Sequence, residues 1–237
     1  MLGRSWLVAL AFAGVGFGTA GVNAASAADV PPAAVADPAA PKIIGVVLYP
    51  GFEVLDVFGP VEMWGYAPGV KVVTIAEHAG PVLSSQGVLV NADFDFKTAP
   101  SLDLMMVPGG KGTFTEVKNP AMLDFLRSED QHTRLTISVC SGAAILARAG
   151  LLKGRRATTN KLYFAQLTSD EPGVTWVKRA RWVDDGKYVT SSGVAAGTDM
   201  ALDVLAKIYG RDQARNLARS VEYEWNEDPD HDPFAIE

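Results

Sequence analysis

Short apolar runs alternate with segments of helical spacing along most of this chain. Four runs rich in Val, Ile, Leu and Met, each closed by a Gly, Pro or polar residue, occupy residues 42–52, 70–77, 102–112 and 134–139. The first of these, residues 42–52, is a short continuous apolar run, which is typical of a strand buried on both faces of a parallel sheet, and the other three predict further strands. Apolar residues recur at helical spacing in residues 53–67, 119–132, 141–150, 195–210 and 211–225.

Local signals add ends and turns to this pattern. Asn119-Pro120 is a typical helix start, with Asn as N-cap and Pro in the first turn. Residues 81–96 alternate around a Gly and predict a hairpin or a pair of short strands, and residues 174–193 predict a hairpin with Asp185-Gly186 at its turn. The sequence therefore predicts an α/β fold: a single-domain flavodoxin-like sandwich whose mostly parallel sheet carries helices on both faces.

The first 41 residues follow neither pattern. Residues 1–27 contain one basic residue, Arg4, then a charge-free apolar stretch that ends in Ala-Ser-Ala. This is the layout of a cleavable signal peptide, and it predicts an exported protein, periplasmic or secreted. The alternative is an uncleaved anchor, which the Gly- and Ala-rich composition disfavours. Residues 28–41 are rich in Pro and Ala and predict a linker, so the folded domain should span residues 42–237.

Charge and composition narrow the possible partners. The chain has 237 residues, of which 48% are hydrophobic, and a formal charge of −6. Removing Arg4 with the signal peptide makes the charge −7, so nucleic acid is not an expected partner. The single cysteine excludes an internal disulfide, and the three histidines show no ligand spacing, so neither a metal nor another cofactor is expected.

The single cysteine lies where a predicted strand gives way to a predicted helix. Cys140 follows residues 134–139, and the small residues Gly142 and Ala143 leave room for the sharp turn of a nucleophile elbow. A helix N-terminus at this point favours thiolate over thiol, and its N–H groups would bind an oxyanion. The alternative is a small buried apolar side chain, the commonest role of a lone Cys.

Two other strand ends carry possible chemistry. Gly109 and Gly110 close the strand predicted at 102–112, where their N–H groups would approach a ligand closely. The alternative is an ordinary pair of loop glycines. Asp56 lies in an apolar segment, where a carboxylate needs a partner or a proton, although most lone Asp residues are caps or surface residues.

Five ordered segments resemble the ThiJ/PfpI family, single-domain relatives of class I glutamine amidotransferases. They are "LYPGFEVLDVFGPVEMW", "LMMVPGGKG", "VCSGAAILARAGLLKGRRATTN", "SSGVAAGTDMALDVLAKIYG" and "VEYEWNEDPDHDPF". The "LD-x-x-GP" acid and the "GRRATT" stretch look most like the isonitrile hydratase branch, whereas the last segment departs from the family pattern. The resemblance implies a small-molecule substrate and a homodimer.

The resemblance also implies roles for individual residues. Cys140 matches the nucleophile, Asp56 the acid beside it, and Ser141 the position after the nucleophile. Gly109 and the Ser141 backbone match oxyanion donors, and Gly110 and Asn160 are expected to contact substrate. Asn160 replaces a His of many relatives and cannot accept a proton, which disfavours a Cys–His dyad. Asp56, its pKa raised by a neighbouring thiolate, would instead serve as general acid.

The sequence leaves several functions open. The favoured one is a cysteine-dependent hydratase or hydrolase that converts an isocyanide and water to an N-substituted formamide. The alternative is a non-catalytic or redox-sensing, stress-protective domain with an oxidisable Cys. A third is the ligand-sensing half of a transcription regulator, which an exported protein without a DNA-binding module would not be. The last is a peptidase-like activity.

Overall fold

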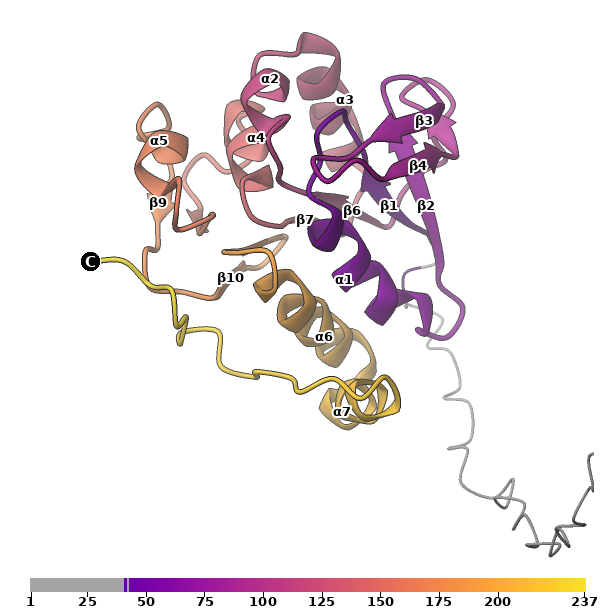
Figure 1. Cartoon of the computed structure of the whole chain (residues 1–237), viewed down its shortest axis with the longest axis vertical. Coiled ribbons are helices and arrows are strands. Elements are labelled where there is room, and N and C mark those ends of the chain that lie inside the picture. Colours follow the sequence, from indigo (N-terminus) through magenta and orange to yellow (C-terminus); the bar gives the residue numbers. More distant parts are fainter. Residues whose placement is uncertain (1–40, 42) are drawn as a thin grey trace, which may run out of the picture. The chain divides into compact units, whose positions relative to one another are not determined.

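A seven-stranded sheet forms the centre of the protein (Figure 1). The structure, a computed structural model, describes residue 41 and residues 43–237, so the predicted signal peptide and nearly all of the linker lie outside the described residues. The strand order is β10-β11-β7-β6-β1-β2-β5, and all neighbours are parallel except β10 and β11. The strands are β1 (Ile43–Val47), β2 (Lys71–Ala76), β5 (Phe94–Asp95), β6 (Leu104–Val107), β7 (Leu135–Ser138), β10 (Trp182–Asp185) and β11 (Tyr188–Ser191).

Helices cover both faces of this sheet, as the alternating pattern predicts. In Figure 1 one layer contains α2 (Thr113–Glu116), α3 (Pro120–Asp130) and α4 (Gly142–Arg148). The other layer contains α1 (Val54–Gly65), α6 (Ala196–Tyr209) and α7 (Arg211–Ser220). The predicted start of α3 is confirmed, because the Asn119 side chain accepts from the Ala121 N–H at 3.0 Å. The predicted fold class is therefore confirmed.

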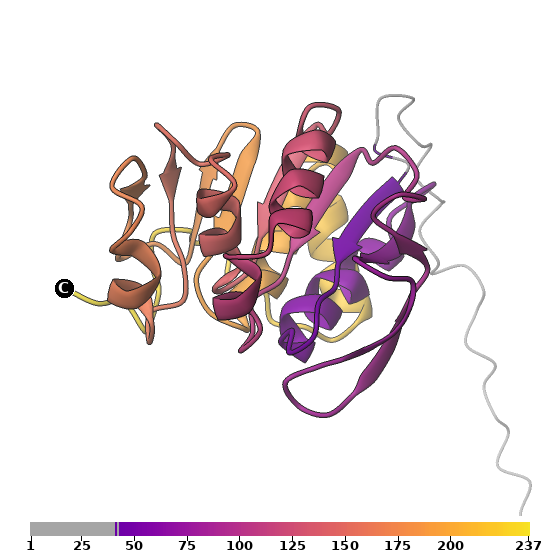
Figure 2. The same cartoon turned by 90° about the horizontal axis from the view of Figure 1, so that it is seen from above.

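Two small sheets lie outside the central one. The hairpin predicted at 81–96 is formed by β3 (Gly80–Leu83) and β4 (Leu89–Ala92), which pair antiparallel. β8 (Arg156–Ala157) and β9 (Thr175–Trp176) pair in parallel, with α5 (Phe164–Thr168) between them in the chain. Figure 2 shows α5 and the C-terminus beside the edge of the central sheet at which β10 and β11 lie.

Three details of the predicted elements are wrong. Thr175 and Trp176 belong to β9 rather than to the second hairpin, because they pair with β8. The turn of that hairpin is Gly186-Lys187, one residue later than predicted, since Gly186 supplies the positive φ (76°) that the first turn residue needs. The last helix ends at Ser220 rather than residue 225.

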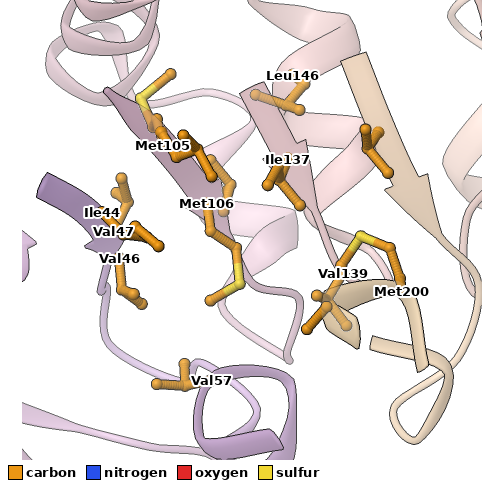
Figure 3. Close-up of a cluster of buried hydrophobic side chains, with 14 of the residues drawn as sticks. Ile44, Val46, Val47, Val57, Met105, Met106, Ile137, Val139, Leu146 and Met200 are labelled. Atoms are coloured by element: carbon orange, nitrogen blue, oxygen red, sulfur yellow. The ribbon is translucent and has the colours of Figure 1, made fainter. Parts of the chain in front are cut away.

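The core is continuous across the sheet. In Figure 3, Leu146 of α4 lies on one side of β6 and β7, whereas Val57 of α1 and Met200 of α6 lie on the other. Met105 and Met106 point to opposite sides, as successive strand residues must, and both are fully buried. This packing fixes the carboxyl ends of β1, β6 and β7 relative to one another, and the candidate site lies there.

Candidate active site

Cys140 lies in a strained turn between β7 and α4. Its φ is 57°, a left-handed conformation that non-glycine residues rarely adopt. The backbone is held on both sides: the Cys140 N–H donates to the Ser191 carbonyl at 3.2 Å, and its carbonyl accepts from Thr159 Oγ1 at 2.9 Å. A Cβ at Gly142 would lie 2.2 Å from the Val107 carbonyl oxygen, so only glycine fits there. This geometry is the predicted nucleophile elbow.

The carboxyl group of Asp56 is fully buried beside this turn. Its Oδ2 accepts from the Gly109 N–H at 2.7 Å, whereas Oδ1 has no hydrogen-bond partner among the described residues. Burial, and secondarily the charge of Glu53, raise the pKa of Asp56 to about 8, although the Gly109 bond and an interaction with the Cys140 thiol oppose the shift. At neutral pH the carboxyl group is therefore mostly protonated, beside the only thiol of the chain.

The same surroundings raise the pKa of the Cys140 thiol, whereas the sequence predicts a lowered pKa. Burial, and then the Asp56 carboxylate, raise the pKa of Cys140 above its ordinary value. The Ser141 N–H and the Asn160 side chain lower it, but they do not outweigh the loss of water around the sulfur. The helix N-terminus therefore does not make Cys140 a free thiolate, and the thiol and the carboxyl group titrate as a coupled pair.

Gly109 lets the three site segments approach one another. A Cβ at this position would lie 2.5 Å from Ser141 Oγ, 2.6 Å from Ser141 N and 2.9 Å from Asp56 Oδ2. Because its N–H is bonded to Asp56, Gly109 positions the acid, and an oxyanion would have to compete for that donor. The Ser141 N–H, the other predicted donor, lowers the pKa of the Cys140 thiol and so lies close to it.

A chain of hydroxyl groups holds Ser141 in place. The Tyr49 hydroxyl donates to the Pro108 carbonyl at 2.6 Å, so it must accept from Thr113 Oγ1, 3.1 Å away. Thr113 has then used its proton and accepts from Ser141 Oγ at 2.8 Å, while Ser141 Oγ accepts from the Gly110 N–H at 3.0 Å. The hydroxyl of Ser141 and the N–H of Gly110 are thus engaged with each other, and Ser141 acts in positioning the turn.

Asn160 lies beside the Cys140 thiol. Its side chain interacts with Cys140, and its Oδ1 accepts from the Tyr163 N–H at 3.2 Å. Among the described residues, the groups that set the pKa of Cys140 and of Asp56 include no histidine. No group of three or more His, Cys, Asp or Glu side chains in that same part of the chain is placed to hold a metal ion.

The structure thus brings all six predicted site residues to one edge of the sheet. Three hydroxyl residues that hold the turn, Tyr49, Thr113 and Thr159, are not among the sequence predictions. Tyr49 follows β1 by two residues, and a polar residue at the carboxyl end of a predicted strand is a signal that would have found it. Thr159 follows β8, a two-residue strand that the sequence does not reveal, so no such signal exists for it.

Comparison with known proteins decides the family of this chain. The profile of the DJ-1/PfpI family matches residues 42–207, which include Asp56, Gly109, Cys140 and Asn160. The chain belongs to the DJ-1/PfpI family. The isonitrile hydratase of Pseudomonas putida is 37% identical over 180 residues, which are 76% of this chain and 78% of that enzyme.

Other similar proteins show how varied the relatives are. The transcriptional regulator CdhR of Pseudomonas aeruginosa is 31% identical over 169 residues, and the match covers 69% of this chain but only 50% of the regulator. A ThiJ/PfpI family protein from Pseudomonas syringae has a TM-score of 0.71 at 32% identity, covering 78% of this chain and 76% of its own. A DJ-1 superfamily protein from Salmonella typhimurium has a TM-score of 0.69 at 28% identity, covering 78% and 100%. Membership in the DJ-1/PfpI family thus fixes the fold, while the activity depends on the site.

Proposed function

We propose that this DJ-1/PfpI protein is a cysteine-dependent hydratase that converts an isocyanide and water to an N-substituted formamide. The observation that carries the proposal is the buried Asp56 carboxyl group beside Cys140, with a pKa of about 8 and an unpartnered Oδ1. The reaction needs a nucleophile and a proton donor at one carbon atom, and this pair supplies both. The similarity to an isonitrile hydratase supports the same activity.

The first step forms a covalent intermediate. The terminal carbon of the isocyanide accepts the Asp56 proton while Cys140 Sγ forms a bond to the same carbon. The thiol proton passes to the carboxyl group, so Asp56 gives one proton and receives another. The product is a thioformimidate, in which the former isocyanide carbon carries one hydrogen, the sulfur and a double bond to nitrogen.

The second step consumes one water. Water adds to the carbon of the thioformimidate, with one proton going to nitrogen and the hydroxyl group to carbon. The C–S bond then breaks, the hydroxyl proton returns to the sulfur, and the N-substituted formamide leaves with Cys140 and Asp56 restored. Atoms and charges balance, with no redox change, and no step requires a histidine.

The alternative of a redox-sensing domain has less support. Oxidation of a thiol depends on its thiolate fraction and its exposure. The Cys140 side chain is buried and its pKa is raised, and both features slow oxidation. The same features do not prevent the proposed reaction, because Asp56 takes the thiol proton during attack.

A turnover assay tests the proposal. Purified protein is incubated at pH 7 with benzyl isocyanide and with cyclohexyl isocyanide, and formamide production is followed. Wild type should turn over, whereas Cys140→Ala should not, since Ser141 Oγ is engaged by Thr113 and Gly110. Hydration that persists in Cys140→Ala would exclude the covalent mechanism.

Asn160 provides a second test of the same proposal. If a histidine were the missing base, Asn160→His should greatly raise ester or peptide hydrolysis. With Asp56 as the acid, this variant should keep isocyanide hydration within about tenfold, or about 1.4 kcal/mol of barrier. Asn160→Ala should cost no more than about 1.5 kcal/mol, one neutral hydrogen bond. An Asn160→Ala protein as inactive as Cys140→Ala would show that proton transfer or substrate orientation depends on residue 160, and Asp56 could then not be the sole acid.

We also propose that the protein is exported and that it forms a homodimer. The residue pattern of the first 27 positions supports cleavage and export, and family resemblance supports a homodimer. N-terminal sequencing of protein from an exporting host should find a chain that begins near residue 28. A chain that retains its first residue would refute export by cleavage.

A further inference from the structure

We propose that the cavity beside Asn160 binds the side group of the substrate, that this group is apolar and uncharged, and that Phe234 of the C-terminal tail determines its size. This inference rests on the proposed hydratase function. The cavity measures about 380 Å³, room for an aryl or branched alkyl group. Its apolar wall consists of Leu162, Val194, Ala195, Ala196 and Phe234.

The cavity lies close to the nucleophile, because residues that line it contact Cys140 or adjoin a residue that does. Asn160 lines the cavity and also interacts with the Cys140 thiol. On the other side, Ser192 lines the cavity, and the preceding residue, Ser191, accepts the Cys140 N–H at 3.2 Å. A substrate whose reacting carbon meets the sulfur past Asn160 would therefore extend its side group into this cavity.

The charged groups at the base of the cavity already have partners. Asp232 Oδ2 accepts from Ser192 Oγ at 2.6 Å and lies 4.0 Å from Lys161 Nζ, and Asp232 Oδ1 lies 3.9 Å from the Arg181 guanidinium. Arg181 Nε also donates to Asp199 Oδ2 at 2.8 Å. A charged side group would enter without a counter-ion, at the cost of its own hydration. The base therefore excludes carboxylate and ammonium groups.

The ammonium group of Lys161 is held inside the protein. Its Nζ donates to Thr158 Oγ1 at 2.6 Å and to the Ala180 carbonyl at 2.8 Å, and it lies 4.0 Å from Asp232 Oδ2. Two of its three donors are therefore bonded, and the Asp232 carboxylate balances its charge. The side chain therefore braces the base of the cavity and does not reach out to a ligand.

Asp232 also positions the side chain of Phe234 at the opening of the cavity. Asp232 is buried, and its Oδ1 accepts from the Phe234 N–H at 3.0 Å, which fixes the turn from which Phe234 projects. Phe234 is 74% exposed, and a bound side group would cover part of its apolar surface. Asp232 is thus a positioning residue for Phe234. This tail is also the segment whose sequence departs from the family pattern.

Hydration rates for graded side groups test the inference. kcat/KM should be at least tenfold higher for benzyl isocyanide than for methyl isocyanide, because apolar groups in such a cavity contribute about tenfold or more. Phe234→Ala should reduce this ratio about tenfold, and Phe234→Leu should retain most of it. Tyr66→Ala is the matched control, since Tyr66 is a 62% exposed aromatic residue at the end of α1, outside the cavity. A ratio unchanged by Phe234→Ala would overturn the inference.

A second readout does not depend on turnover. Cys140 is alkylated with iodoacetamide and with N-benzyl iodoacetamide, and the ratio of the two rates is measured in the same variants. Phe234→Ala should lower the preference for the benzyl reagent, and Tyr66→Ala should not. If this shift occurs without any isocyanide hydration, the cavity assignment stands and the hydratase proposal fails. If hydration occurs but neither ratio shifts in Phe234→Ala, the hydratase proposal stands and the cavity assignment fails.

Discussion

Asp56→Asn should make the stability of this protein less dependent on pH. Burial raises the pKa of Asp56 from 3.8 to about 8, so between these values the folded protein binds a proton that the unfolded chain has lost. A group with a raised pKa stabilises the fold fully below its unfolded value, and that contribution is lost as pH rises towards the folded value. Each pH unit in this range removes about 1.36 kcal/mol from the free energy of unfolding, so about 4 kcal/mol of stability is lost between pH 4 and pH 7.

The variant removes this one titration and leaves the others in place. Asparagine keeps an oxygen for the Gly109 N–H and stays neutral at every pH. The free energy of unfolding of Asp56→Asn minus that of wild type should therefore increase by about 4 kcal/mol from pH 4 to pH 7 and level off above about pH 8. Urea unfolding followed by circular dichroism across pH 4–9 measures both proteins.

A matched control gives the opposite sign. Hydrogen bonds from Thr98 lower the pKa of the half-buried Asp95, so Asp95→Asn should lose stability relative to wild type as pH rises through the range in which Asp95 ionises. A difference between Asp56→Asn and wild type that stays flat from pH 4 to pH 8 would refute the reasoning. It would mean that Asp56 is already ionised at neutral pH and cannot be the acid.

Three further outcomes follow from the site. Alkylation of Cys140 by iodoacetamide should keep rising with pH and not level off by pH 9, because burial and the Asp56 carboxylate raise the pKa of the thiol, whereas isocyanide hydration should fall as pH rises through about 8 because it needs the Asp56 proton; parallel profiles would contradict this assignment. Gly109→Ala should cost at least about 1–3 kcal/mol of stability, because its Cβ would overlap Ser141, while Gly65→Ala, which meets open space, should be neutral or stabilising in thermal unfolding. Tyr49→Phe should cost about 1–2 kcal/mol, since it deprives the buried Thr113 hydroxyl of its acceptor; an unchanged melting temperature would show that the hydroxyl chain contributes nothing.

The order of the main elements could be predicted from the sequence because each is long enough to show its period. β1 and β6 contain no polar side chain, β7 alternates Leu135 and Ile137 with polar residues, and α6 has an apolar face over fourteen residues. β5, β8 and β9 have two residues each, which is too short for any periodicity, so the sequence does not reveal them. The last helix ends early because Tyr223 and Trp225 bond to Asp199, a contact between distant segments.

In the site, too, features set by neighbouring residues could be predicted, whereas features set by residues far apart in the chain could not. The turn at Cys140 could be predicted because its causes are neighbours in sequence, above all Gly142. The pairing of Asp56 with Cys140 joins positions 84 residues apart, and only family resemblance indicated it. The direction of the thiol pKa could not be obtained from the helix N-terminus, because burial and the Asp56 carboxylate outweigh it.

The most direct test of the central claim is the mass of the protein during turnover. Wild-type protein mixed with benzyl isocyanide at pH 7 is quenched in acid within the first turnover and analysed by mass spectrometry. A thioformimidate on Cys140 adds the whole mass of the isocyanide, since addition loses no atoms, and peptide mapping should place that mass on Cys140. Formamide production without any added mass on Cys140 in the first turnover, or the same added mass in Cys140→Ala, would contradict a covalent mechanism at this residue.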